Sequence, residues 1–148
     1  MTPSRVKVPA GTAARVLVDT GVLVALFDRL DKHHDAACTW MASTHAALIT
    51  VPSVLCETAL FLPPRLRAEL AGLAARGVLQ VHTPDATGHA RMATLFDEYR
   101  DCDPDWADLE LVWLAETTGA QHIATLNVAD FSVYRIHGRK RFELALLG

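Results

Sequence analysis

Residues 16–27, with the sequence VLVDTGVLVALF, predict a buried strand that passes directly into a short helix. The apolar, β-branched start of this segment is typical of a strand covered on both faces. Asp19 stands at the carboxyl end of the strand, and Thr20 and Gly21 turn the chain into the apolar helix. Because burial of an unpaired carboxylate is costly, we expect Asp19 to have a cation, a hydrogen-bond network or a route to water.

Strands and helices alternate along the rest of the chain, with turn residues between them. Besides the first strand, we predict strands over 47–50, 78–82, 122–125 and 142–146. Besides the first helix, we predict helices over 33–44, 52–63, 65–75, 85–99 and 104–118. This alternation predicts an α/β fold with a mainly parallel central sheet. In such a sheet the working site lies beyond the carboxyl ends of the strands, which is where Asp19 stands.

The helix over 104–118 has a well-marked start. Asp103 can cap it, and Pro104 suits its first position, where no N–H is needed. Asp105 favours the positive end of the helix dipole. Asp105 and Asp108 are three positions apart, so we expect both carboxylates on one face of this helix.

The composition is that of one globular domain. The chain has 148 residues, of which 51% are hydrophobic and 21% charged, so it can bury a sizeable core. We expect a flexible lead over 1–14 and a single domain over 15–148. The net charge of -3 neither indicates nor excludes a nucleic-acid partner, because carboxylates in a metal site offset basic residues in the total.

The three cysteines, Cys38, Cys56 and Cys102, are widely spaced and form no C-x-x-C motif. We expect them to be reduced thiols, mostly buried as small apolar groups, in a cytoplasmic protein. The sequence has no run of about eighteen apolar residues, so we expect no segment to span a membrane.

Four acidic residues form a candidate catalytic site: Asp19, Glu57, Asp105 and Asp108. Each of them alone has an ordinary explanation as a turn residue, a helix cap or one half of an ion pair. Asp19 and Glu57, however, each lie in an otherwise apolar segment. A divalent cation explains several of the acids together, because Mg²⁺ prefers oxygen ligands and removes the repulsion between clustered carboxylates.

Five segments resemble the PIN-domain family, and especially its toxin branch, the VapC-like ribonucleases. These segments are 18–26 (VDTGVLVAL), 31–37 (DKHHDAA), 54–57 (VLCE), 105–116 (DWADLELVWLAE) and 125–131 (TLNVADF). The resemblance covers residues 16–146, nearly the whole chain. It implies a PIN-like three-layer α/β/α fold around a mainly parallel sheet.

The resemblance also implies a role for each of the four acids. Asp19, Glu57 and Asp108 are expected to coordinate the principal ion, Mg²⁺ or Mn²⁺, directly or through waters. Asp105 is expected to complete or flank the site. All four would then be catalytic residues, and a metal-bound water would attack phosphorus without a side-chain nucleophile.

Three further residues are expected to support this site. Thr20 and Thr125 are expected to hydrogen-bond the carboxylates or the substrate phosphate. Asn127 stands where the family often has an acid. An Asn can orient a metal-bound water but brings no charge, which leaves the number of metal ions open.

Arg135, Arg139, Lys140 and Arg141 make the densest basic stretch of the chain. The ordinary explanation is a solvated loop. The functional alternative is that these residues hold RNA phosphates beside the acidic site, or the acidic residues of an antitoxin.

The resemblance implies a metal-dependent endoribonuclease whose products carry 5′-phosphate and 3′-hydroxyl ends. It also implies a VapB-like antitoxin as partner, and a homodimer. Two alternatives remain open: a PIN-type nuclease of RNA processing, and a PIN fold with a decayed site that only binds a partner. A phosphatase-like enzyme with an Asp nucleophile is disfavoured, because Gly21 stands where an Asp-x-Asp motif needs its second acid.

Overall fold

A five-stranded parallel sheet runs through the centre of the computed structural model, which describes residues 14–145. The strand order is β3-β2-β1-β4-β7, and each strand is parallel to its neighbours. The strands are β1 (Arg15–Val18), β2 (Ala47–Thr50), β3 (Leu79–Val81), β4 (His122–Ala124) and β7 (Glu143–Ala145). The predicted parallel sheet is therefore confirmed, although the last residue of the predicted final strand, Leu146, lies outside the described residues.

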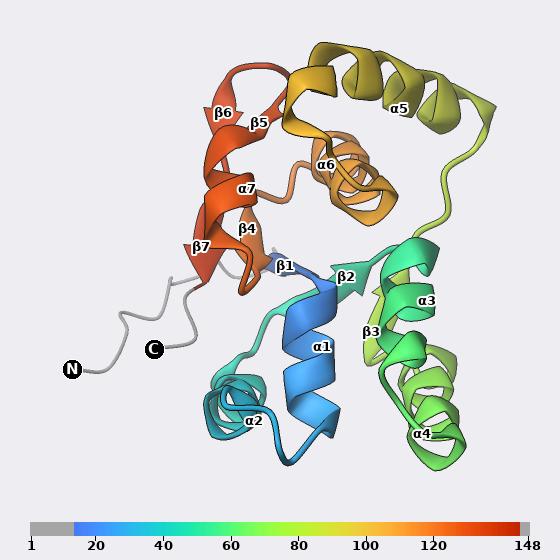
Figure 1. Cartoon of the computed structure of the whole chain (residues 1–148), viewed down its shortest axis with the longest axis vertical. Helices are drawn as coiled ribbons and strands as arrows, with labels where there is room; N and C mark the ends of the chain where they lie inside the picture. The colour runs from blue at the N-terminus through green and yellow to red at the C-terminus, as the bar shows by residue number, and fades with distance from the viewer. Residues whose placement is uncertain (1–13, 146–148) are drawn as a thin grey trace.

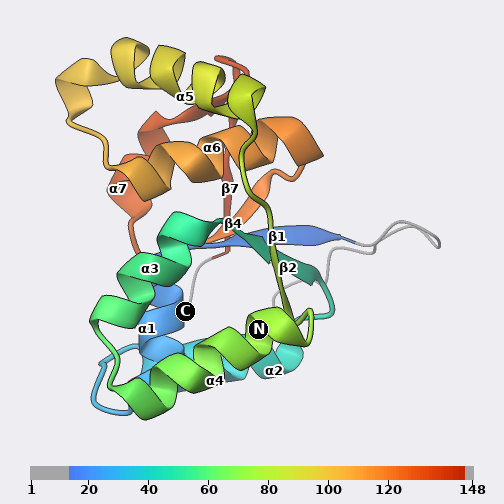
Figure 2. The same cartoon turned by 90° about the vertical axis from the view of Figure 1, so that its right-hand side faces the viewer.

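Helices cover both faces of the sheet (Figure 1). They are α1 (Thr20–Phe27), α2 (His34–Ser43), α3 (Pro52–Leu60), α4 (Pro64–Ala75), α5 (Ala86–Glu98), α6 (Trp106–Thr118) and α7 (Val128–Val133), with a 3₁₀ turn at Arg100–Cys102. Figure 2 shows α5 and α6 on one side of the sheet and α1, α2 and α4 on the other. Helix α3 contacts both α1 and α6 and so links the two helical layers. The three-layer α/β/α arrangement agrees with the prediction.

Helix α6 forms the centre of its layer. All of its residues from 107 to 115 are buried, and most are large and apolar. A helix that is apolar all round can only be stable inside a protein, because every face then loses contact with water. Two acids, Asp108 and Glu110, nevertheless lie in this buried stretch, and both are less than 5% exposed.

The start of α6 differs from the prediction. Asp103 does not cap the helix: its backbone is left-handed, with φ of 46°, and it ends the preceding 3₁₀ turn. Asp105 is the cap instead, because its backbone is extended and its side chain accepts a hydrogen bond from the N–H of Asp108 at 2.8 Å. The helix therefore begins at Trp106, two residues later than expected.

The segment between β4 and β7 contains more structure than the predicted polar turn. It forms α7 and then an antiparallel hairpin of β5 (Arg135–Ile136) and β6 (Lys140–Arg141). A helix of six residues is too short to show a periodic pattern, and strands of two residues show none at all.

The prediction that the cysteines are mostly buried is wrong. Cys56 and Cys102 are exposed and Cys38 is half-buried, although all three thiols are free. Among the residues described, no helix is long and apolar enough to cross a membrane. The predicted flexible lead over 1–14 lies outside the described residues, except for its last position.

Candidate active site

The order of the strands creates a switch point between β1 and β4. From β1 the chain proceeds to β2 on one side, and from β4 it proceeds to β7 on the other. Loops that leave such a pair in opposite directions open a crevice beyond the strand ends, where ligands bind in sheets of this kind. Asp19 directly follows β1, and its N–H donates to the carbonyl of Ala124 at the end of β4, at 3.1 Å.

The crevice is an open pocket of about 390 Å³. It is lined by Asp19, Thr20, Gly21, Glu57, Asp105, Asp108, Leu126 and Asn127. The structure thus brings all four predicted acids together from three distant parts of the sequence. A larger hollow of about 660 Å³ lies between α1, α2 and the start of α4, but it contains none of these acids.

Three of the acids are each held by a hydroxyl group. Thr125 donates to Oδ2 of Asp19 at 2.8 Å, and Thr20 donates to Oε2 of Glu57 at 2.9 Å. The third hydroxyl belongs to Tyr134, which donates to Oδ2 of Asp108 at 3.0 Å. Each hydroxyl comes from a different segment from its carboxylate, so the three contacts also fix the segments relative to one another.

Asp105 and Asn127 are held differently. Asp105 is exposed, and one of its carboxylate oxygens is used in capping α6. The side-chain amide of Asn127 donates to Oδ2 of Asp130 at 2.7 Å, and its backbone N–H donates to the Thr125 hydroxyl at 2.9 Å. Asn127 therefore stands at the edge of the pocket with its N–H₂ group directed to Asp130.

Burial and mutual repulsion act strongly on two of the acids. Burial raises the pKa of Asp19; hydrogen bonds from Thr125 and Thr20 oppose the rise, and the charges of Asp105 and Glu57 add to it. Burial, followed by the charges of Asp105 and Asp19, raises the pKa of Asp108 to about 8. Carboxylates crowded in this way are stabilised in their ionised form by a cation.

The matching family model shows what kind of domain holds this pocket. The model of the PIN domain matches residues 16–135, which include every acid of the pocket. The chain belongs to the PIN-domain family. The predicted family is therefore confirmed.

Two proteins of Mycobacterium tuberculosis are similar to this PIN domain. The ribonuclease VapC26 of strain ATCC 25618 / H37Rv is 30% identical over 133 residues, which cover 87% of this chain and 98% of the relative. The crystal structure of VapC20, described as a sarcin-ricin loop cleaving toxin, superposes with a TM-score of 0.68. That structure is 21% identical, and the match covers 73% of this chain and 86% of the other, so it shows a shared fold.

The donor set of this PIN domain fits a well-hydrated divalent ion. Within residues 14–145, no group of three or more His, Cys, Asp or Glu side chains is placed so that it could hold a metal ion by itself. The pocket instead offers carboxylates and hydroxyls around open space. Mg²⁺ is usually bound in this manner, through one or two carboxylates and several retained waters.

The predicted RNA-binding residues lie on the β5–β6 hairpin of the PIN domain. Arg139, Lys140 and Arg141 are exposed there. Arg135 is half-buried, and its Nη1 donates to three carbonyls at the end of α7 at 2.7, 2.9 and 3.1 Å. Arg135 thus caps α7, while the other three side chains face solvent.

Sequence reasoning missed two residues that contact the site or its helices. Tyr134 gives no signal in the sequence, because an aromatic residue after a short helix is ordinary core material. Glu110 accepts hydrogen bonds from the N–H and the hydroxyl of Ser53, at the first turn of α3, the helix that carries Glu57. An acid inside an otherwise apolar helix was the available signal for Glu110.

Proposed function

We propose that this PIN domain is a metal-dependent endoribonuclease and the toxin of a toxin–antitoxin pair. The observation that carries the proposal is the convergence of Asp19, Glu57, Asp105 and Asp108 in one pocket. Two of these acids have raised pKa values, and none of the four forms an ion pair with a Lys or Arg of the described chain. A divalent ion would supply the positive charge that balances these carboxylates.

Asp19, Glu57 and Asp108 would hold this ion, Mg²⁺ or Mn²⁺, directly or through water. When bound, the ion would lower the pKa of a water molecule and neutralise charge on the scissile phosphate. The hydroxyls of Thr125 and Thr20 keep the carboxylates of Asp19 and Glu57 in place, which limits the reorganisation needed on binding.

Asp105 and Asn127 complete the rim of the pocket beside the proposed metal site. Asp105 keeps its position through its hydrogen bond to the first turn of α6. Asn127 brings a polar group without a charge, so it would orient water or phosphate oxygens rather than attract a further ion.

The RNA backbone on either side of the scissile bond would need cations of its own. Arg139, Lys140 and Arg141 are exposed and would bind RNA backbone away from the scissile bond, because the Arg141 carbonyl accepts from Gln121, just before the start of β4, and the pocket lies beyond the other end of that strand. As partners, we propose a VapB-like antitoxin and a second copy of this chain, in the cytoplasm. Light scattering of the isolated protein tests the homodimer.

The deciding experiment is cleavage of a mixed RNA pool by the antitoxin-free protein. Wild type should cleave with Mg²⁺ or Mn²⁺ and stop when the metal is chelated, and the products should carry 5′-phosphate ends. Asp19→Asn should be folded and inactive, because it removes a buried ligand while keeping the size of the side chain and its contact with Thr125. Metal-independent cleavage, or equal cleavage by Asp19→Asn, would contradict the proposal.

One observation favours a second function, that of a binding module without catalysis. Asn127 replaces an acid of the family pattern, and its amide is engaged with Asp130. A folded, metal-loaded wild type that binds RNA or an antitoxin tightly but cleaves none of the pool would establish this second function.

A further inference from the structure

Tyr134 is a buried aromatic residue whose hydroxyl contacts one of the acids that line the active-site pocket. It directly follows α7 and is 2% exposed. Its hydroxyl donates to Oδ2 of Asp108 at 3.0 Å. Among the residues described, it is the only side chain that donates a hydrogen bond to this carboxylate.

The ring of Tyr134 is held from two sides. It packs edge-on against Tyr99, with ring centroids 5.2 Å apart, and edge-on against Phe131 at 5.3 Å. Its backbone N–H donates to the carbonyl of Asp130 at 3.1 Å and ends α7. A side chain fixed by packing and by its backbone places its hydroxyl at a defined point, so little freedom is lost when the hydrogen bond forms.

We propose that Tyr134 is a positioning residue for the metal-binding carboxylate of Asp108. This inference rests on the proposed function, because it assigns Asp108 to the ion. With one oxygen held by Tyr134, the carboxylate of Asp108 is fixed in one orientation toward the pocket. Thr125 holds Asp19 in the same way, so the two most buried ligands are each oriented by one hydroxyl. Partners of this kind behind metal ligands tune both affinity and geometry.

The chain contains a matched control for this role. Tyr99 belongs to the same aromatic cluster, and its hydroxyl also makes one hydrogen bond, accepting from the N–H of Arg135 at 2.9 Å. It contacts none of the four acids. Tyr99→Phe and Tyr134→Phe therefore remove the same atom from neighbouring rings, and only the second removes it from a metal ligand.

The first test is calorimetric titration of Mn²⁺ into wild type and the two variants, without RNA. Tyr134→Phe should bind Mn²⁺ about tenfold more weakly than wild type. Tyr99→Phe should match wild type within about twofold, while thermal unfolding should show similar losses of stability for both. Wild-type Mn²⁺ affinity in Tyr134→Phe, or equal weakening in both variants, would overturn the assignment.

A second test uses cleavage as a function of Mn²⁺ concentration. Tyr134→Phe should lose cleavage at low Mn²⁺ and recover most of it at saturating Mn²⁺, with an unchanged KM for RNA. A purely structural role would lower cleavage equally at all Mn²⁺ concentrations. If wild type binds Mn²⁺ and cleaves no RNA, the proposed function fails while the role of Tyr134 is still decided by the titration. If wild type binds no Mn²⁺, both fail.

Discussion

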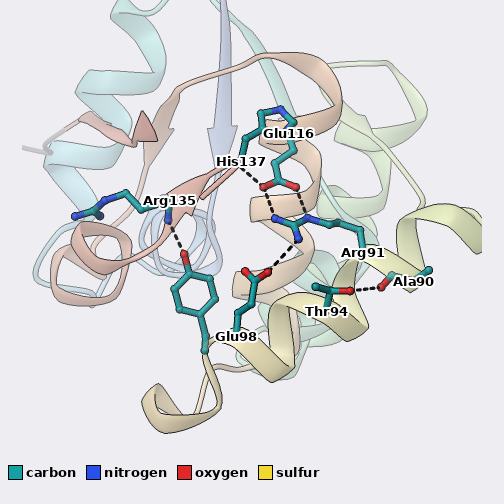
Figure 3. Close-up of polar contacts among 8 residues, drawn as sticks. Ala90, Arg91, Thr94, Glu98, Glu116, Arg135 and His137 are labelled. Atoms are coloured by element: carbon teal, nitrogen blue, oxygen red, sulfur yellow. Dashed lines mark hydrogen bonds and ion pairs between the residues drawn. The ribbon is translucent and has the colours of Figure 1, made fainter. Parts of the chain in front are cut away.

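Helix α6 carries a poorly exposed acid near each end, Asp108 and Glu116, and the two have opposite electrostatic surroundings. Near the carboxyl end, Arg91 donates to both oxygens of Glu116, at 2.7 and 3.0 Å, and the backbone N–H of His137 donates at 2.7 Å (Figure 3). Although burial opposes them, these contacts hold the pKa of Glu116 below its usual value. Near the amino end, burial and then the charges of neighbouring acids raise the pKa of Asp108 to about 8.

This difference separates a structural acid from an acid kept for a ligand. Glu116 receives its cation from within the chain and ties α5, α6 and the hairpin turn together. Asp108 accepts a hydrogen bond from one hydroxyl and forms no ion pair with a Lys or Arg of the described chain. Two acids on one helix can therefore be told apart by their partners, although both are nearly buried.

The largest expected effect is on cleavage. Asp108→Asn should lower the rate of RNA cleavage by more than about a hundredfold, because loss of a metal ligand should cost more than loss of an outer partner. Glu116→Gln should cleave within about threefold of wild type at a temperature where both are folded, since Glu116 contacts no group of the pocket. Gel assays of RNA cleavage at saturating Mn²⁺ measure both variants. Equal losses of cleavage rate would show that Asp108 and Glu116 do not differ in role.

The next effect is on how stability depends on pH in the metal-free protein. The folded state holds a proton on Asp108 between pH 3.8 and about 8, and the unfolded state does not, so stability falls as pH rises through this window. Asp108→Asn should remove this part of the fall. Between pH 5 and pH 8.5, the Tm of wild type should fall by at least about 4 °C more than the Tm of the variant. Addition of Mn²⁺ at pH 8.5 should raise the Tm of wild type again and leave the Tm of the variant unchanged.

Glu116 should show the opposite trend with pH. Its lowered pKa contributes stability above its ordinary pKa of 4.5, and this contribution is lost as pH falls. Glu116→Gln should cost about 2 kcal/mol of unfolding free energy at pH 7, less than a fully buried pair, because Arg91 is 31% exposed. Urea titrations should show this cost shrinking below pH 4. A cost that is constant with pH would mean that the ion pair is not its source.

The smallest expected effect concerns Asn127. Asn127→Asp adds a carboxylate to the pocket beside Asp130, so the metal-free protein should be slightly less stable and Mn²⁺ should bind about threefold more tightly. Calorimetric titration with Mn²⁺ measures this effect, and Asn127→Ala is the control. The Ala variant loses the amide without gaining a charge, so it should not bind Mn²⁺ more tightly. Unchanged Mn²⁺ binding by Asn127→Asp would show that this position lies outside the reach of the ion.

The sheet, the main helices and the pocket acids could be predicted from sequence, because each depends on local pattern. Asp19 ends an apolar strand, and Glu57 lies in an apolar helix, so both stand out from their surroundings. The partners of these acids could not be predicted, because the hydroxyl that holds Asp108 comes from a residue 26 positions away on another element. The true cap of α6 was missed because Asp103 and Asp105 are equally suitable caps, and only the left-handed backbone of Asp103 distinguishes them.

Because β4 lies beside β1, the pocket joins residues that are synthesised early with residues that are synthesised late. Asp19 is held by Thr125, which lies 106 positions later in the chain, and Asp108 is held by Tyr134, which comes later still. A chain emerging from the ribosome, which grows by about 5–20 residues per second, therefore exposes its first acid long before the groups that complete the pocket. A nuclease of RNA gains from such an order, because its pocket cannot be complete before Tyr134 has been added to the growing chain.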